Sequence, residues 1–343
     1  MFNKLTNNNT PPLLTIGIPT FNREELLIQT INFFLGEISR LPPDSVELIV
    51  SDNCSTDSTE NSVNKLINKT NEGFFRYSKN IKNIGFDANV EKIISLARGD
   101  YVWLFSDDDW CAEGALETIK NSIFSNLPLS FAFVNYNIKV DSKYLPSRCK
   151  VLTTVVVDAR ELLISIDFAN SLISSCIFSR ESWVRFNSKK YFGCAWIHLM
   201  MARDILCSGR SLIIGERLVT MRGLSLQESR REKSNDSLEG IEFYMEAHLK
   251  FAEFASTLSE HGQSHRTQAM AVKLSEKEDL YQIINYKLTT NKYKFSQINR
   301  TWVKLARFRT KKVLFWLAYT PLLYMHQIVV SITYKYFKKL KNL

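Results

Sequence analysis

The stretch YVWLFSDDDW, residues 101–110, passes directly from five hydrophobic residues into three consecutive carboxylates. Asp107, Asp108 and Asp109 repel one another at neutral pH, so a chain folding for stability alone would gain little from grouping them. The hydrophobic run has the composition of a buried strand, which would carry the acids to the edge of a sheet. The stretch therefore predicts a β-strand that ends in a charged turn able to bind a cation or do chemistry.

The residues around this stretch alternate between strand and helix patterns. Strand candidates are short, apolar and rich in β-branched residues: LLTIGIPT (13–20), VELIVSDN (46–53), FFRYSKN (74–80) and YVWLFSDD (101–108). Helix candidates repeat apolar residues at helical spacing or begin with capping residues: 23–39, 55–69, 87–97 and 112–125. This alternation predicts an α/β fold, Rossmann-like, with a mostly parallel sheet and flanking helices on both faces.

Polar residues follow each predicted strand of this first half at the point where it ends. The carboxyl ends of parallel strands lie along one edge of a sheet, and ligands bind outside that edge. The strand ends here are 20–23, 51–53, 80–85 and 106–109. We therefore expect SDN at 51–53 and SDDD at 106–109 to lie on the same edge.

Three consecutive aspartates have four ordinary explanations: a divalent metal site, a general acid–base pair, a helix cap or a solvated turn. Asp109 precedes the helix predicted at 112–125 and could cap it. Alternatively, Mn2+ or Mg2+ bound by one or two carboxylates and by substrate phosphates would relieve the repulsion and stabilise a departing diphosphate. Neither GxxxxGK[ST] nor GxGxxG occurs at a strand–helix junction, which disfavours P-loop and dinucleotide-binding proteins.

Pattern and composition divide the chain into four parts. We expect an N-terminal tail at 1–12, a first half of the main domain at 13–110 and a second half at 111–226. The second half contains strand-like runs at 130–140 and 211–222 separated by irregular sequence, and it is the expected place for the second substrate. A polar linker at 227–240 opens the last part, 227–343, whose pattern is helical.

The net charge of +9 is concentrated at the end of the chain, because residues 280–343 hold 13 of the 44 Lys and Arg residues and no Asp or Glu. Within this region, 313–334 is 22 residues long without a formal charge, but Pro321 lies near its middle and lysines flank both ends. We expect this basic, aromatic region to lie on an anionic inner-membrane surface. A single membrane span, or helices packed on the body or a partner, are the alternatives.

Six cysteines are scattered along the chain, without a C-x-x-C pair or a cluster at zinc-ligand spacing. This usage indicates a reduced protein facing the cytosol and without a structural metal. The N-terminus lacks the apolar region of a signal peptide. With the basic tail, these features predict a peripheral protein on the cytoplasmic face of the inner membrane.

Four blocks in this order resemble the nucleotide-sugar half of a family 2 glycosyltransferase with the GT-A fold: IPTFNR (18–23), VELIVSDNCSTDST (46–59), NIGFDANV (83–90) and GDYVWLFSDDD (99–109). SLISSCIFSRESW (171–183) and YFGCAWIHL (191–199) resemble an abequosyltransferase-like branch that builds O-antigen side branches. The resemblance implies a metal-dependent enzyme that moves a sugar, such as a deoxyhexose, from a CDP-, UDP- or dTDP-linked donor. Its acceptor would be a lipid-linked saccharide of lipopolysaccharide, with no role for nucleic acid.

The resemblance also assigns roles to single residues. The family's first loop, which lines the nucleotide and diphosphate, matches Pro19, Thr20, Phe21 and Arg23. The acid that recognises the pyrimidine matches Asp52, Asn53 stands where many members have a second Asp, and the turn beside the nucleoside matches Asn83 and Gly85. Asp107 and Asp108 match the pair that contacts ribose and metal, with Asp109 as a candidate third ligand.

The general base is where the sequence departs from the family. Members usually supply an Asp from an ED motif, but CAWIHLMMARD (194–204) has Trp196 and His198 near that place and no paired acid. His198 is the leading candidate, because imidazole accepts a proton near neutral pH. A structural histidine on an apolar helix is the alternative, and Asp204 is expected on another face of that helix.

Two other functions remain open from the sequence. A nucleotidyltransferase acting on sugar phosphates would also use carboxylate-bound magnesium, but it would release pyrophosphate. A non-catalytic, membrane-docked binding protein would depend on the basic tail and not on Asp108.

Overall fold

The computed structural model describes residues 12–222, except 71–72, 148, 150, 167–171, 194–195 and 207. The chain divides into two compact units, 1–223 and 224–343, and the described residues belong to the first. The expectations for residues 1–11 and for the basic region at 227–343, including 313–334, lie outside the described residues. Among the described helices, none combines the length and the apolar character needed to cross a membrane.

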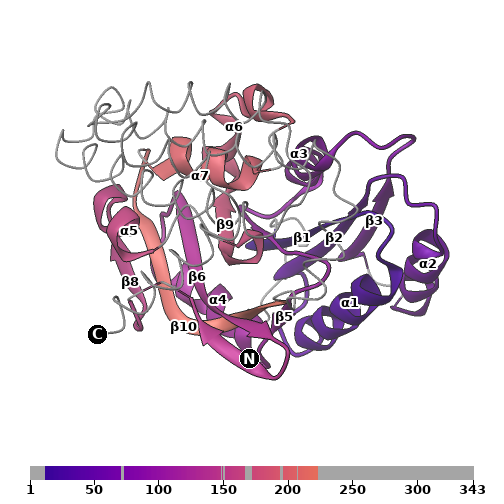
Figure 1. Cartoon of the computed structure of the whole chain (residues 1–343), viewed down its shortest axis with the longest axis horizontal. Helices are drawn as coiled ribbons and strands as arrows, with labels where there is room; N and C mark the ends of the chain where they lie inside the picture. The colour runs from indigo at the N-terminus through magenta and orange to yellow at the C-terminus, as the bar shows by residue number, and fades with distance from the viewer. Residues whose placement is uncertain are drawn as a thin grey trace, which may run out of the picture. The chain divides into compact units, whose positions relative to one another are not determined.

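The first half contains four parallel strands. They are β1 (Leu14–Thr20), β2 (Val46–Asp52), β3 (Phe75–Lys79) and β4 (Tyr101–Leu104), and they lie in the order β3-β2-β1-β4. The helices α1 (Glu24–Ile38) and α2 (Thr59–Thr70) cover one face, and α3 (Phe86–Leu96) covers the other (Figure 1). Every residue of β1, β2 and β4 is buried, which explains their continuous hydrophobicity.

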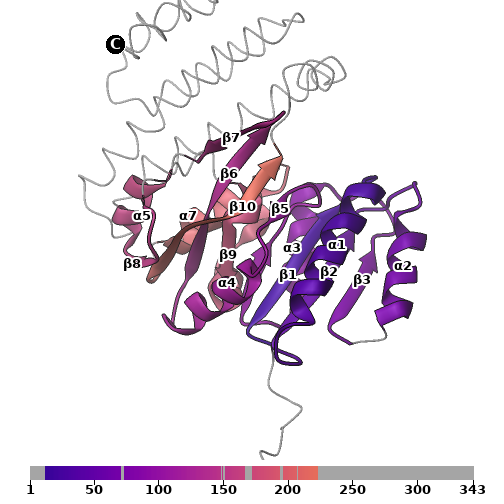
Figure 2. The same ribbon diagram turned by 90° about the horizontal axis from the view of Figure 1, so that it is seen from below.

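The second half makes the sheet mixed, where the sequence predicted a mostly parallel one. β9 (Cys176–Ser179) pairs antiparallel with β4 and with β6 (Phe131–Val140), and β10 (Ser211–Arg222) runs parallel to β6. Short antiparallel strands complete it: β5 (Trp110–Cys111), β7 (Lys143–Pro146) and β8 (Val155–Val157). Figure 2 shows β6, β10 and β9 continuing the sheet beyond β1. Strands of two to four residues are too short to show periodicity, so tertiary pairing alone reveals them.

The remaining helical elements lie in the second half. They are α4 (Ala115–Phe124), α5 (Ala159–Ser165), α6 (Arg180–Val184), α7 (Ile197–Leu206) and the 3-10 turns η2 (Ile173–Ser175) and η3 (Ser188–Tyr191). α4 is capped by Gly114, which adopts a left-handed conformation with φ 74°. The alternative that Asp109 caps this helix is therefore wrong, because the antiparallel strand β5 separates it from α4.

A cluster of aromatic rings supports the acidic turn that follows β4. Phe34, Trp103 and Phe105 are fully or almost fully buried and meet edge to face, with ring centroids 4.9 to 5.7 Å apart. The indole Nε1 of Trp103 donates to the carbonyl oxygen of Ser174 at 2.8 Å. The ring contacts fix the end of β4 against α1, and the Trp103 bond fastens it to η2 of the second half, which together restrict where the acids can lie.

Candidate active site

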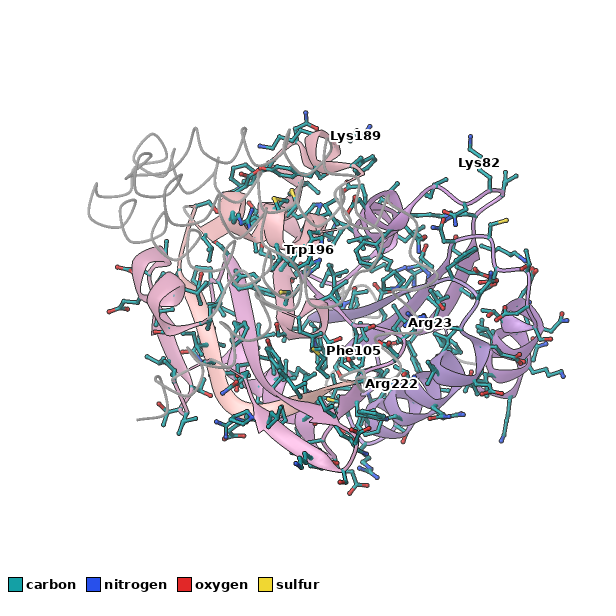
Figure 3. The ribbon with its side chains drawn as sticks, in the orientation of Figure 1. Arg23, Lys82, Phe105, Lys189, Trp196 and Arg222 are labelled. Atoms are coloured by element: carbon teal, nitrogen blue, oxygen red, sulfur yellow. The ribbon has the colours of Figure 1, made fainter. Side chains whose placement is uncertain are left out.

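Arg23 holds two of the three aspartates of the acidic turn. Its Nη1 lies 2.7 Å from Asp108 Oδ2 and 3.2 Å from Asp107 Oδ1. The Thr20 hydroxyl, at the end of β1, donates to Asp107 Oδ2 at 2.8 Å. Figure 3 shows Arg23 and Arg222 in the same region of the view as Phe105, the residue that precedes Ser106 and the acids. The strand ends β1 and β4 thus meet at one edge, as the sequence predicted.

All six carboxylate oxygens of the turn accept a hydrogen bond from the protein. The second oxygen of Asp108 accepts from the Ser106 hydroxyl at 2.5 Å. Asp109 faces the second half of the domain instead, where its oxygens accept from the Ser174 hydroxyl at 2.6 Å and from the Arg222 amide at 3.1 Å. Asp107 and Asp108 therefore both pair with the Arg23 guanidinium, whereas Asp109 is held by Ser174 and the Arg222 amide.

Burial and neighbouring charges adjust the pKa values of this turn in opposite directions. Burial raises the pKa of Asp107 to about 6, although Arg23 and Thr20 oppose the shift. Burial likewise raises the pKa of Asp109 to about 7, and the Ser174 hydrogen bond opposes it. Burial acts to lower the pKa of Arg23, but Asp107 and Asp108 together raise it above its ordinary value. Arg23 is therefore a permanent positive charge at this edge.

The acidic turn provides carboxylate oxygens, which are suitable ligands for a divalent cation, but its three carboxylates do not converge on one point. In the part of the chain that the structure describes, no group of three or more His, Cys, Asp or Glu side chains is close enough to hold a metal ion. The side chain of Asp108 is 24% exposed, and a carboxylate oxygen that accepts one hydrogen bond retains a lone pair. The residues fit an ion held by one or two carboxylates and completed by substrate phosphates.

Asp52 is fully buried at the end of β2, where two groups orient its carboxylate. The Ser55 amide donates to Oδ1 at 2.8 Å, and the Tyr77 hydroxyl donates to Oδ2 at 2.5 Å. Burial, and the charge of Asp52, raise the pKa of Tyr77 far above its ordinary value, so it remains a donor. No role for Tyr77 was expected from the sequence. The place of Tyr77 in β3 could have indicated this contact. Lys79 pairs with Asp52 across the sheet, and Tyr77, two residues earlier, lies on the same sheet face as Lys79.

Asn53, Asn83 and Gly85 come together in one network, although Asn53 lies 30 residues before Asn83 in the sequence. Asn53 donates from Nδ2 to Asn83 Oδ1 at 2.8 Å, and its own Oδ1 accepts from the Ile84 amide at 2.9 Å. The Gly85 amide also donates to Asn83 Oδ1, at 2.9 Å. Gly85 has φ 83°, a left-handed conformation that favours glycine. Asn53 thus organises the turn that starts α3, and its contact with a nucleotide base stays a prediction.

The first loop continues this edge beyond β1. Pro19 and Thr20 are the buried last residues of the strand and pair with Ser51 and Asp52, whereas Phe21 is 42% exposed. Asn22, at φ 53°, accepts a hydrogen bond from the Thr56 amide at 2.8 Å. The loop after β1 is therefore fastened to the loop after β2 by a contact that the sequence did not reveal.

His198 lies near the start of α7 and is almost fully buried. Its ring stacks on Trp196 with centroids 6.4 Å apart and meets Phe86 edge-on at 6.5 Å. Asp204 lies farther along the helix, where it accepts from the Tyr191 hydroxyl at 3.0 Å and pairs with Lys190 at 2.9 Å. A role for His198 as a base remains a prediction, and Asp204 is occupied by other partners.

Comparisons with known proteins find glycosyltransferases similar to this chain. Residues 15–170 match the model of glycosyl transferase family 2. The abequosyltransferase RfbV of Salmonella typhimurium is 28% identical over 269 residues, which are 70% of this chain and 74% of that protein. A Campylobacter jejuni protein named GalNAc(5)-diNAcBac-PP-undecaprenol beta-1,3-glucosyltransferase is 32% identical over 32% of this chain and 33% of its own.

Solved structures show the same fold. The S. aureus protein TarS, residues 1–349, superposes with a TM-score of 0.67 at 14% identity, covering 88% of this chain and 82% of that one. The same protein in complex with UDP-GlcNAc has a TM-score of 0.66, with 94% of this chain and 91% of that one covered. At this identity the likeness concerns the fold alone.

Proposed function

We propose that this glycosyltransferase moves a sugar from a pyrimidine-nucleotide donor to a lipid-linked saccharide during surface polysaccharide synthesis. The match of residues 15–170 to the family 2 model and the similarity to RfbV support this proposal. The observation that carries this proposal is the bridge from Arg23 to Asp107 and Asp108, on the same sheet edge as Asp52. A sugar-nucleotide diphosphate carries negative charge that such an edge can hold through a cation.

On the donor side, Asp52 and Asn53 would contact the base, with Asn83 and Gly85 beside the nucleoside and Pro19, Thr20 and Phe21 lining the nucleotide. Asp107 would contact the ribose and, together with Asp108, would hold Mn2+ or Mg2+; Asp109, the third candidate, faces Ser174 and the Arg222 amide instead. When bound, such an ion neutralises charge on the departing diphosphate. Arg23, with its permanent charge and 46% exposed side chain, would stabilise the same diphosphate from the protein side.

On the acceptor side, Trp196 would stack on a sugar ring and His198 would take the proton of the attacking hydroxyl. The partner is a lipid-linked saccharide, and the enzyme works peripherally on the cytoplasmic face of the inner membrane. Two observations support this: the basic region 280–343 suits an anionic membrane surface, and the Campylobacter relative is named for a PP-undecaprenol compound. The name of the Salmonella relative supports a deoxyhexose donor.

A thermal-shift screen of CDP, UDP and dTDP, each with and without Mn2+, tests the donor side, since a ligand that binds only the folded state raises its stability. We expect one of the three to raise the melting temperature, and more so with Mn2+. The matching sugar nucleotide is then incubated with a membrane extract that contains lipid-linked saccharides. Release of a nucleoside diphosphate supports glycosyl transfer, whereas release of pyrophosphate indicates nucleotidyl transfer and contradicts the proposal.

A further inference from the structure

The first turn of α3 contacts the start of α7, and these helices belong to opposite halves of the domain. Asp87 Oδ1 accepts a hydrogen bond from the Ile197 amide at 3.1 Å, across 110 residues of sequence. One residue earlier, the ring of Phe86 meets His198 edge-on. Asp87 is 3% exposed, so this contact is shielded from water.

Asp87 accepts from an amide in the part of α7 that needs a partner. The first amides of a helix have no acceptor within the helix, and a carboxylate there also interacts favourably with the helix dipole. Ile197 is the first residue of α7, and the carbonyl of Trp196 accepts from the Leu199 amide at 2.9 Å. Holding Ile197 therefore holds Trp196 and His198 on either side of it.

The N-terminal side of the same α3 turn is bonded to the network of Asn53, Asn83 and Gly85, which we propose lies beside the nucleotide. Asn53 is bonded to Asn83 and to the Ile84 amide, and Asn83 accepts from the amide of Gly85, the N-cap of α3. An unbroken series of contacts thus runs from the end of β2 to the start of α7.

Close packing limits how far α3 can move independently of the sheet. A Cβ on Gly17 of β1 would lie 2.2 Å from Ile93 Cγ2, so the helix rests directly on the strand backbone. A change in the turn at 83–85 is therefore passed to the first turn of α3 more readily than it is absorbed by sliding of the helix.

We propose that Asp87 is a positioning residue that couples the nucleotide-side turn to Trp196 and His198 at the acceptor side. A nucleoside diphosphate that orders the turn at 83–85 then orders the start of α7, so the acceptor side is completed once the donor is bound. This inference rests on the proposed function, since it takes that turn as the nucleotide side.

Hydrogen–deuterium exchange of the full chain tests the coupling. It is measured with and without Mn2+ and a saturating nucleotide, namely the one of CDP, UDP and dTDP that gives the largest thermal shift. The variants are Asp87→Ala, which removes the acceptor, and Asp87→Asn, which keeps an oxygen for the Ile197 amide. Asp158→Ala is the matched control, because Asp158 likewise accepts from a helix amide, Glu161, at 2.8 Å, but in α5. Phe86→Ala removes the other α3 contact at a 37% exposed residue, and it serves if Asp87→Ala does not fold.

In the wild type and in the Asp87→Asn and Asp158→Ala variants, we expect the nucleotide to slow amide exchange at the start of α7 by at least about threefold. In Asp87→Ala this protection is lost, and exchange without nucleotide is about tenfold faster, because a bond to a charged acceptor is removed. Phe86→Ala should reduce the protection at least by about half. A role limited to fold stability would leave the nucleotide-dependent difference intact.

Three results overturn the inference. The first is that bound nucleotide leaves amide exchange of α7 in the wild type unchanged. The second is that Asp87→Ala keeps the full nucleotide-dependent protection. The third applies if Asp87→Ala does not fold, and it is that Phe86→Ala keeps the full protection. Each of these leaves the proposed function standing. Failure of all three nucleotides to bind overturns the inference and the proposed function together.

Discussion

Arg23 and Asp108 form an ion pair of 2.7 Å at the edge of the sheet, and the same nitrogen reaches Asp107 at 3.2 Å. The charge that the three aspartates require is thus supplied in part by the protein itself. An incoming divalent cation meets carboxylates that are already paired, so Arg23 and the cation compete for them.

Replacing Arg23 with Met should therefore tighten binding of Mn2+ to the nucleotide-free protein by about tenfold, since two carboxylates lose a competing charge. Turnover should fall at least about tenfold, because the diphosphate loses a cation. Electron paramagnetic resonance titration of free Mn2+ measures the first effect. Arg40→Met is the control, because Arg40 also lies between two carboxylates, Glu37 at 2.9 Å and Glu113 at 3.7 Å. Unchanged Mn2+ affinity in Arg23→Met would contradict the competition.

Asp108→Ala should reduce metal-dependent turnover by about a hundredfold or more, because it removes the most accessible carboxylate of the turn. The fold should persist, since Asp108 is partly exposed and its partners Arg23 and Ser106 can reach water. Initial rates at increasing Mn2+ measure the loss, and Asp100→Asn, an exposed acid before β4, is the control. Full turnover of Asp108→Ala without added metal would show that the proposed mechanism is wrong.

Ser174→Ala should destabilise the protein more at pH 8 than at pH 5, by roughly 1–2 kcal/mol. Burial raises the pKa of Asp109 to about 7, so between about pH 4 and pH 7 the folded chain retains a proton that the unfolded chain releases. The contribution of this group to stability therefore decreases as the pH rises through that window. Above it, Ser174 stabilises the charged carboxylate by donating to Oδ2.

Denaturant unfolding at the two pH values measures this difference. Ser175→Ala is the matched control, because the hydroxyl of this buried neighbour donates to the Leu172 carbonyl, which does not titrate. Its effect should be equal at both pH values. Equal effects of Ser174→Ala at pH 5 and pH 8 would show that Asp109 does not titrate in this range.

Asp52→Ala and Tyr77→Phe should separate nucleotide recognition from support of the carboxylate. Asp52→Ala should weaken binding of the preferred nucleoside diphosphate at least about tenfold, since a hydrogen bond to a charged group is lost. Tyr77→Phe removes only the donor at 2.5 Å, which should lower stability by about 1 kcal/mol and change the affinity less than about threefold. Isothermal titration calorimetry and denaturant unfolding provide the measurements. Equal losses of affinity in both variants would argue that Asp52 is structural.

His198→Gln should lower kcat by about a hundredfold if the imidazole takes the acceptor proton. Donor affinity should stay within about threefold, because Trp196 and Phe86, which the His198 ring contacts, are not part of the acidic turn. The pH–rate profile should also lose its rise through the neutral range. A lower melting temperature with an unchanged pH profile would instead assign His198 to packing.

The elements of the first half could be predicted from the sequence because their signals are local. Every residue of the strand candidates at 13–20 and 46–53 that became β1 and β2 is buried, and helices expected at 23–39 and 87–97 became α1 and α3. Alternation of such elements implies a parallel sheet, and a parallel sheet brings its carboxyl ends to one edge. The shared edge of Asp52 and the acidic turn followed from this order alone.

The partners of those residues were decided by tertiary structure. Arg23 pairs with Asp108 across 85 residues and Ser174 binds Asp109 across 65, and no local pattern encodes which donor meets which acid. In the second half, the strand-like runs at 130–140 and 211–222 became β6 and β10. The antiparallel pairing there was missed for the same reason, since β9 has only four residues and gains its stability from β4 and β6.

The kind of residue present at each strand end follows from the amino-acid order, because hydrophobic periodicity and chain order are properties of neighbouring positions. The direction of each charge depends on the folded chain: Asp107 and Asp108 face Arg23, and Asp109 faces Ser174 and the Arg222 amide. A buried carboxylate oxygen is costly without a hydrogen bond, and most of the donors that reach this turn come from distant parts of the chain.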